Sequence, residues 1–565
     1  MLSILAPWVR QAALAVFLAA SALPASGSSL SGAYLAAMQA DFRDDYPEAA
    51  LYYDKALALD PTNAGLLTNA VVSRVAMGDV PAARALADRL QEADPNNQVA
   101  ALVRIADTLA TGEFDQSGTM LSAAGDTVNP LLGGLLAGWI DVGKEDFAAA
   151  QASFDAMTAN DALKAYGQYH KALALAFAGD FVSAETILAG GEDGPLHLNR
   201  SSIVAHAEVL AQMGRETDAI AVIDEAMSGG LPDAPLLALR DRLAAGEEVT
   251  FDVVTRPRDG AAEAFLTLAD ALNTPDSDRI ALLHARLAAH IRPDLIEAQL
   301  LSGEILETEG QHDLATAALA GVPEDSPWYV TAQIRRADTQ RAAGDPEAGL
   351  ATLIALAAGH GDLVEVESSL GDALRTAERY PEAAAAYGRA IDLIATPGPA
   401  HWVLYYSRGI ANERADDWPA AEADFREALR LEPDQPLVLN YLGYSMVEKR
   451  ENLDEALGMI EQAAKAQPED GYITDSLGWV FYRLGRYDEA VKPMLRAVEL
   501  TPDDPVINDH LGDVLWMVGR KREAEFQWRR ALSFGPADDL DMDRIRKKLE
   551  VGLDQVLAAE PKQDG

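Results

Sequence analysis

The sequence predicts an all-α superhelical solenoid of about 13 helix–turn–helix repeats, closed by a C-terminal capping helix. The first observation is a period near 34 residues, which separates Gly478 from Gly512 and Ala490 from Ala524. The second is that small residues and a closing proline recur at fixed places in each period. The third is a composition typical of folded soluble chains, with 49% hydrophobic and 24% charged residues.

Residues 1–27 have the pattern of an export signal. Arg10 precedes an apolar stretch from Ala12 to Leu23, which is shorter than a membrane span needs. Pro24 ends that stretch, and Ala25-Ser26-Gly27 offers small residues for cleavage. We therefore predict export to the periplasm, with processing near Gly27. An uncleaved segment that tethers the chain to the inner membrane is the alternative.

Residues 28–247 are predicted to form an N-terminal array of degenerate repeats. Ala49, Tyr53, Ala56 and Pro61 mark a well-formed copy, and the copies that follow keep the spacing but lose the signature. Residues 248–262 then break the pattern. Glu248–Thr255 is rich in β-branched residues, and Arg256–Gly260 is typical of a turn. This segment is either a junction between two arrays or a long loop between repeats.

Residues 263–540 are predicted to form a C-terminal array with a clear signature. Leu-Gly pairs recur at Gly443, Gly478 and Gly512, and each is followed by alanines and a proline at near-constant offsets. Small side chains let two helices cross closely, and proline cannot continue a helix. Each copy exposes an apolar face that only a neighbouring copy can bury, so the copies must stack.

Residues 541–565 are predicted to form a capping helix and a tail. Ile545, Leu549, Leu553 and Val556 fall on one stripe of a helix from Asp541 to Ala559. Arg546, Lys547 and Lys548 are placed on the other side of that helix. Such a helix would cover the apolar face of the last repeat.

The pattern of small pair, first helix, small residue, second helix and proline resembles the tetratricopeptide repeat. Three stretches, Asn440–Lys449, Asp475–Ala490 and Asp509–Ala524, resemble more closely a proteobacterial family of periplasmic and outer-membrane adaptors. The segment Asp259–Ala264 is also similar to the middle of that family. The resemblance implies a scaffold for a carboxyl-terminal processing protease that degrades peptidoglycan hydrolases. The chain contains no cysteine, so it lacks the lipidated cysteine of those adaptors.

Composition and motifs argue against several other functions. The formal net charge of −43 opposes binding of nucleic acid. Gly138–Lys144 matches the first part of a phosphate-binding loop, but position 145 is Glu rather than Ser or Thr. None of the nine histidines forms the pair with i, i+4 spacing of a helical metal site. We therefore predict no catalytic residues, no cofactor and no metal site, and hence no enzyme.

The concave face of the last four repeats is the predicted binding groove. In stacked helix pairs the first helices line that face, and positions around each repeat glycine point into it. Those positions carry aromatic residues interleaved with carboxylates, a mixture typical of peptide-binding surfaces. The alternative is that the aromatic residues pack between repeats. The predicted groove residues are Tyr406, Glu413, Tyr444, Asp475, Trp479, Tyr482, Asp509, Asp513 and Trp516.

These predictions lead to one functional hypothesis and one main alternative. The first is a non-enzymatic scaffold in the cell envelope that binds proteins or peptide segments, among them a processing protease and its substrates. The carboxylates of Asp509 and Asp513 favour a bound segment that carries Lys or Arg. The alternative is an assembly factor for an outer-membrane, secretion or polysaccharide machine that uses the same groove. In both, the chain would contact a membrane only through an uncleaved signal or a partner.

Overall fold

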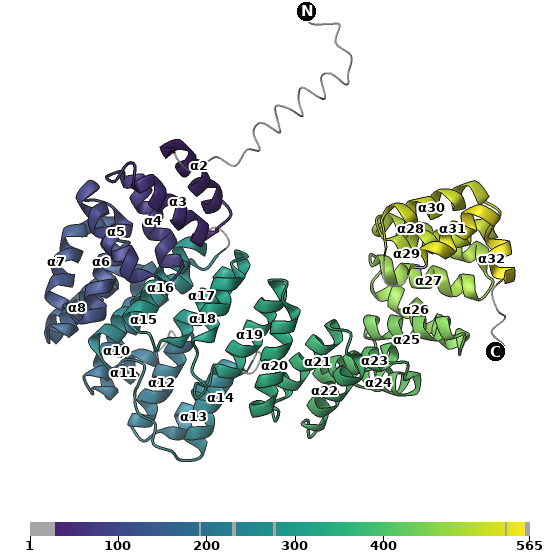
Figure 1. The fold of residues 1–565 in the computed structure, drawn as a ribbon. Coiled ribbons are helices and arrows are strands. Elements are labelled where there is room, and N and C mark those ends of the chain that lie inside the picture. The colour runs from purple at the N-terminus through teal and green to yellow at the C-terminus, as the bar shows by residue number, and fades with distance from the viewer. Residues whose placement is uncertain (1–28, 191–193, 229–232, 275–277, 537–539, 560–565) are drawn as a thin grey trace, which may run out of the picture. The chain divides into compact units, whose positions relative to one another are not determined.

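The computed structural model describes residues 29–190, 194–228, 233–274, 278–536 and 540–559. Within these residues the regular structure is entirely helical, and consecutive helices pair antiparallel and stack, as Figure 1 shows. The predicted all-α solenoid is thereby confirmed. The predicted export signal, residues 1–27, lies outside the described residues. None of the described helices is long and apolar enough to cross a membrane.

The chain divides after Thr352 into two compact units, and each is described by itself below. Unit 1 comprises residues 1–352 and unit 2 residues 353–565. The helices of unit 1 are α2 Leu30–Asp41, α3 Tyr46–Leu57, α4 Ala64–Ala76, α5 Val80–Ala93, α6 Gln98–Thr111, α7 Phe114–Ala124, η1 Gly125–Thr127, α8 Pro130–Gly143, α9 Phe147–Met157, α10 Asp161–Phe177, α11 Phe181–Leu188, α12 Arg200–Gln212, α13 Glu216–Met227, α14 Ala234–Ala244, α15 Pro257–Leu272, α16 Asp278–Ile291, α17 Ile296–Thr308, α18 His312–Ala320 and α19 Tyr329–Ala342.

Helix α20, Pro346–His360, contains the division between the units. The helices of unit 2 are α21 Val364–Thr376, α22 Tyr380–Asp392, η3 Pro399–His401, α23 Trp402–Arg414, α24 Trp418–Leu431, α25 Pro436–Lys449, α26 Leu453–Ala466, α27 Gly471–Arg483, α28 Tyr487–Leu500, α29 Pro505–Met517, α30 Lys521–Ser533, α31 Met542–Val551 and α32 Leu553–Ala559.

Short polar residues start many of these helices. The side chains of Asn63, Asp79 and Asn97 accept hydrogen bonds from backbone N–H groups in the first turns of α4, α5 and α6. These bonds satisfy donors that have no partner within the helix. The helix starts are therefore specified locally, repeat by repeat.

The repeat glycines lie where paired helices cross closely. A methyl group added at Gly478 would lie 2.6 Å from Met494, and one added at Gly512 would lie 2.3 Å from Trp528. Both glycines have ordinary helical backbones, so steric space and not backbone conformation requires glycine. Large side chains from the second helix of each pair fill the space that these glycines leave.

The segment predicted as a junction, residues 248–262, is a non-helical stretch followed by the start of helix α15. The prediction of a turn at residues 256–260 is wrong, because Pro257 begins helix α15, where proline is well tolerated. Helix α15 packs against α8 and α10, and α16 packs against α4 and α6. Residues 248–255 are non-helical, as predicted, and Glu208 of α12 holds them by accepting hydrogen bonds from Asp252 N and Val253 N.

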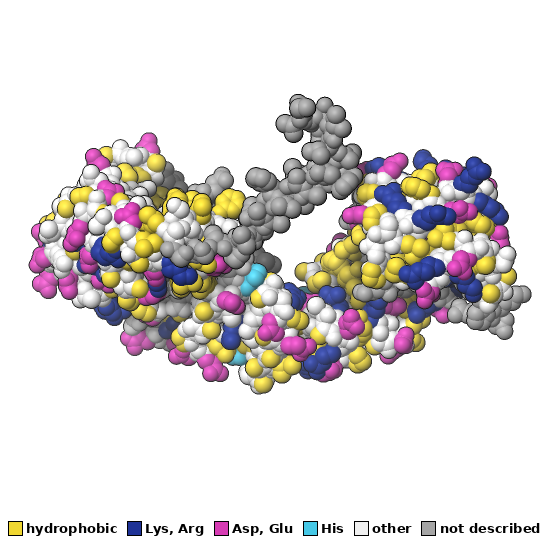
Figure 2. Space-filling model, turned by 45° about the horizontal axis from the view of Figure 1, so that its top comes forward, with side chains coloured by type: hydrophobic (Ala, Val, Ile, Leu, Met, Phe, Trp, Pro, Cys, Tyr) yellow, Lys and Arg dark blue, Asp and Glu magenta, His cyan; other side chains and the backbone are white. Residues whose placement is uncertain are grey.

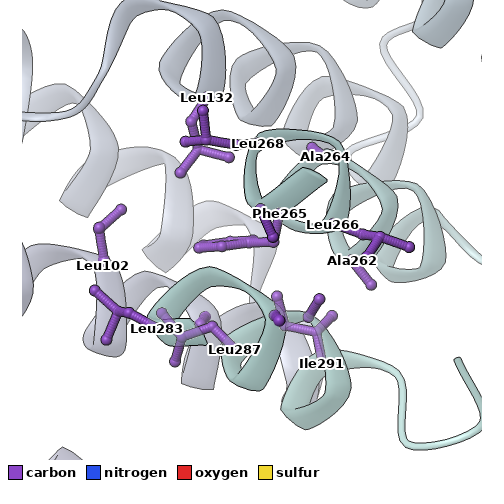
Figure 3. Close-up of a cluster of buried hydrophobic side chains, with 14 of the residues drawn as sticks. Leu102, Leu132, Ala262, Ala264, Phe265, Leu266, Leu268, Leu283, Leu287 and Ile291 are labelled. Atoms are coloured by element: carbon purple, nitrogen blue, oxygen red, sulfur yellow. The ribbon is translucent and has the colours of Figure 1, made fainter. Parts of the chain in front are cut away.

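Helices α15 and α16 therefore occupy the inner face of the N-terminal repeats. Figure 3 shows Phe265 of α15 lying among leucines of α16 and of the N-terminal helices, including Leu102 of α6 and Leu132 of α8. Cationic side chains complete the docking, because Arg258 donates to Ala110 O at 2.7 Å and Arg286 donates to Ala76 O at 3.1 Å. Both carbonyls lie at the C-terminal ends of helices, which cations stabilise.

A buried polar network fixes α15 against α8 and α10. Trp139 Nε1 donates to His170 Nδ1 at 2.8 Å, and the Tyr169 hydroxyl donates to Glu263 Oε1 at 3.0 Å. Burial lowers the pKa of His170 to about 3 and raises the pKa of Glu263 to about 7. His170 is therefore uncharged at pH 7, whereas Glu263 loses its proton only near that pH.

The C-terminal cap of unit 2 differs from the predicted single helix. Gly552, with a φ of 86°, separates α31 from α32. A side chain at that position would also meet the Trp516 ring at 2.6 Å. Two short helices, and not one, therefore cover the last repeat.

Candidate functional site

The predicted groove residues lie on the first helices of the last four repeats, α23, α25, α27 and α29. Tyr406, Glu413, Tyr444, Tyr482, Asp509 and Trp516 are partly exposed, whereas Asp475, Trp479 and Asp513 are buried. The structure does not join all of them into one open surface. It places all of them except Tyr444 in three local clusters along the array.

The first cluster surrounds Tyr406 on α23. Its ring lies 5.8 Å from the Trp402 ring and 5.9 Å from the Tyr441 ring, centroid to centroid. The Tyr441 hydroxyl donates to Glu413 at 3.5 Å. This cluster links α23 to α25, and its members keep part of their surface open to solvent.

The second cluster is a stack of three rings around Trp479 on α27. Its indole lies 3.9 Å from the His510 ring and 4.6 Å from the Tyr482 ring, nearly parallel to both. Its Nε1 donates to Glu448 Oε1 at 2.5 Å. Only 7% of Trp479 is exposed, so the expectation that it stands free in the groove is wrong.

A carboxylate explains the position of His510 in this stack. His510 Nδ1 lies 2.8 Å from Asp475 Oδ2. Burial disfavours the charged imidazole, but the carboxylates of Asp475 and Asp509 outweigh it and raise the pKa of His510.

The third cluster joins Asp509 and Asp513 to the C-terminal cap. Lys548 Nζ on α31 lies 2.8 Å from Asp509 Oδ2 and 2.6 Å from Asp513 Oδ1. Asp513 also accepts from Trp528 Nε1 at 2.9 Å. Lys548 is fully buried, so its predicted placement on the outer side of the cap is wrong. Its own chain supplies the cation that these aspartates were expected to draw from a partner.

The cap also covers Trp516. The Trp516 Nε1 donates to Asp554 on α32 at 3.0 Å, and the Trp516 ring lies 5.3 Å from Trp528. The last repeat is thus closed by α31 and α32. Away from the residues that contact the cap, the predicted groove residues that stay partly open to solvent are Tyr406, Glu413, Tyr444 and Tyr482.

Unit 1 contains a second concave site, which we call the Trp328 cleft. It has a volume of about 340 Å³ and lies between the start of α12, the end of α15 and the inner faces of α17 and α19. Leu266, Leu300 and Leu301 form an apolar lining. The polar lining residues are Asn199, Arg200, Ser201, Asp270, Asn273, Glu297, Glu304, Thr331 and Arg335, beside Trp328 itself.

The two guanidinium groups of the cleft are fixed by carboxylates. Arg200 Nη2 lies 2.5 Å from Asp233, and its guanidinium lies 4.1 Å from the centre of the Trp328 ring. Arg335 Nη1 lies 3.0 Å from Glu304. Because each cation already has an anionic partner, neither adds much free positive charge to the cleft.

The remaining carboxylates give the cleft a negative character. The pKa of Asp270 is raised to about 6, chiefly by burial of the carboxyl and also by Glu297 and Glu304, whereas the hydrogen bond from Asn199 and the charge of Arg200 act in the opposite direction. Asp270 nevertheless stays open to solvent. Across the described residues, no group of His, Asp and Glu side chains is arranged to hold a metal ion. The cleft combines an apolar lining with a few polar and charged groups, which are the features of a binding site.

Sequence reasoning missed this cleft for a physical reason. Its walls come from four helices of degenerate repeats, and no spacing rule connects Arg200 with Trp328.

The burial of Lys548 is different, because Lys548 lies three residues after Ile545 and so shares a helix face with a buried residue. That spacing was a usable signal for its burial.

Comparison with known families identifies the repeats. Models of the tetratricopeptide repeat match residues 43–105, 368–436 and 448–505. A TPR repeat-containing protein of Pseudomonas aeruginosa, PA4667, is 37% identical over 83 residues, which are 15% of this chain and 14% of the relative. The chain thus contains tetratricopeptide repeats, and within the matched segments the helix pairs of the structure are those repeats.

Several solved structures are similar to parts or most of the chain. The Cut9 and Hcn1 complex of the APC/C aligns over 93% of this chain and 97% of its own, at 13% identity and a TM-score of 0.37. A tetratricopeptide repeat protein from Parabacteroides merdae aligns over 45% of this chain and 97% of its own, at 16% identity and a TM-score of 0.37. YrrB, described as having an unusual peptide-binding site, aligns over 32% of this chain and 89% of its own, at 16% identity and a TM-score of 0.27. Such scores carry no conclusion about partners.

Proposed function

We propose that this tetratricopeptide-repeat chain is a non-enzymatic scaffold of the bacterial cell envelope that binds protein segments. A carboxyl-terminal processing protease and its substrates are the partners we favour. The observation that carries the proposal is the Trp328 cleft, a concave site with an apolar lining and charged walls in a stack of repeats. Binding sites of this kind combine apolar contact area with a few placed polar groups.

The surface of the chain suits encounters with other proteins. Figure 2 shows acidic and basic side chains interspersed on the visible surface, although Asp and Glu outnumber Lys and Arg by 89 to 46. An apolar stripe is also exposed on α2, where Leu35 and Phe42 have 62% and 89% of their surface accessible. Exposed apolar stripes of this kind commonly mark protein contacts.

The location in the envelope rests on the amino-terminal sequence. The apolar stretch from Ala12 to Leu23 and the small residues before Gly27 favour export. We expect an alkaline-phosphatase fusion made after residue 40 to be active outside the cytoplasm. An inactive fusion, together with native protein found only in the cytosol, would end the proposal of an envelope role.

The scaffold itself can be tested by cross-linking in cells. A photoreactive residue placed at Thr331 in the Trp328 cleft, or at Tyr444 on α25, should capture specific proteins that mass spectrometry identifies. The same residue at Arg529, whose side chain is 69% exposed on the second helix α30, is the matched control. Capture of a serine protease supports the favoured partner, and capture of secretion or outer-membrane components supports an assembly factor. Equal capture at all three sites would contradict a scaffold that works through its concave faces.

A further inference from the structure

The Trp328 cleft carries more carboxylates than its own cations neutralise. Its guanidinium groups, Arg200 and Arg335, are already paired with Asp233 and Glu304. Among the described residues, neither Asp270 nor Glu297 forms an ion pair, and both line the cleft. An added cation would therefore meet two carboxylates that are outside any salt bridge, although the guanidinium of Arg200 also acts on Asp270 at longer range.

The apolar parts of the cleft determine the kind of cation that fits. Leu300 and Leu301 follow Glu297 on α17, and Trp328, the N-cap residue of α19, packs against the apolar cluster that contains Leu300. A long aliphatic stem can lie on such a lining while its charged end reaches the carboxylates. A volume of about 340 Å³ accommodates one side chain with its neighbouring backbone, at the small end of the range for ligand pockets.

We propose that the Trp328 cleft binds a lysine or arginine side chain of an extended partner segment. The ammonium or guanidinium group lies between Asp270 and Glu297, and its methylene stem lies along Leu300 and Leu301. This inference rests on the proposed scaffold function and names the chemistry of the segment that the scaffold holds. The net charge of −43 assists the encounter, because an anionic chain attracts basic segments over a distance.

A selection experiment with the full chain tests the chemistry. Phage-displayed random dodecapeptides are selected on the wild type, on an Asp270→Asn/Glu297→Gln variant and on a Glu324→Gln/Asp325→Asn variant. Glu324 and Asp325 are exposed residues outside the cleft, so the last variant makes the same change in net charge elsewhere. We expect Lys or Arg to be enriched on the wild type and on this control, and the enrichment to fall at least about tenfold on the cleft variant.

Synthetic peptides from the selection then distinguish the two sources of positive charge. An N-acetylated peptide should bind as well as the free form, and replacing its Lys by norleucine should abolish binding. Loss of binding on acetylation would assign the site to an N-terminal amine and overturn the proposal. Equal enrichment of Lys and Arg on the cleft variant, or no enrichment on the wild type, would overturn it as well.

The pH dependence provides a second readout. Asn199, Arg200, Glu297 and Glu304 face Asp270 from α12 and α17. Because the carboxylate must be ionised to bind a cation, binding of the Lys peptide should weaken by up to about tenfold from pH 7.5 to pH 5. Asp270→Asn should bind weakly and lose most of that pH dependence. Circular dichroism of each variant at both pH values verifies that the fold is intact.

Failure of this inference and failure of the scaffold are distinguishable. If cross-linking at Thr331 still captures a specific partner while Lys and Arg show no enrichment, the scaffold stands and the cation site is wrong. If Thr331 and Tyr444 capture no more than Arg529 does, the scaffold itself is wrong.

Discussion

The Nζ of Lys548 lies 2.6 Å from a carboxylate oxygen of Asp513, and both side chains are almost completely buried. Lys548 belongs to the cap helix α31, and Asp513 to the first helix of the last repeat, α29. Asp509 contacts the same ammonium, and Arg544 Nη1 lies 3.4 Å from Asp513. This charge cluster attaches the cap to the solenoid at a position where a partner's cation was expected from the sequence.

Removing the lysine should destabilise unit 2. Lys548→Met leaves the buried Asp513 and the partly exposed Asp509 without their shared ammonium, and breaking a buried pair on one side costs about 3–5 kcal/mol. Thermal melting should show a lowered transition for this variant. Lys547→Met is the matched control, because that neighbouring lysine is exposed, and its melting should be unchanged. Equal effects of the two substitutions would contradict the importance of the buried pair.

Trp479 should prove to be mainly a packing residue. Trp479→Ala removes a ring that lies between His510 and Tyr482, and truncating a buried tryptophan costs about 3–5 kcal/mol. We therefore expect a clear fall in the melting temperature of unit 2. Tyr472→Ala on the same helix is the control, since 59% of Tyr472 is exposed. A Trp479→Ala variant that melts like the wild type would restore the view of Trp479 as a free groove residue.

The docking of α15 against α8 depends on a glycine. Gly260→Ala places a methyl group 2.3 Å from the Trp139 ring, so one of the two helices must move. Overpacking of this kind typically costs about 1–3 kcal/mol, and hydrogen exchange should show reduced protection in α8, α10 and α15. Gly133→Ala in α8 is the matched control, because its methyl group would meet only Val128 at 3.8 Å. That control should be neutral or stabilising by up to about 1 kcal/mol.

Glu263 should make unit 1 less stable as the pH rises. Its pKa is about 7 in the folded chain and 4.5 as a reference value, so the folded state binds a proton more tightly than the unfolded state. The free energy of unfolding therefore falls between pH 4.5 and pH 7 because of this group. Glu263→Gln keeps a hydrogen-bond acceptor for Tyr169 and removes the titration. The difference in stability between wild type and variant, measured by urea unfolding, should grow in favour of the variant over this range.

A second outcome of this experiment would contradict a raised pKa of Glu263. Histidines such as His170, whose pKa is lowered, give the wild type an opposing pH dependence, so only the difference between the two proteins is diagnostic. If the difference in free energy of unfolding between wild type and variant stays constant from pH 4.5 to pH 7, Glu263 is ionised in the folded chain over this range. That result would contradict the expected effect of burial on its pKa.

The sequence by itself determined the helix pairs and their stacking. Small residues such as Gly478 recur at the spacing of the repeat, and polar residues such as Asn63 occupy helix starts, so local rules are sufficient. The tertiary structure decided which inner faces are filled and which are open. Gly260 fits against Trp139, Lys548 meets Asp513 and Arg200 lies over Trp328 only after the superhelix has formed. These pairs are far apart along the chain and share no period, so shape and charge in three dimensions, and not spacing, select them.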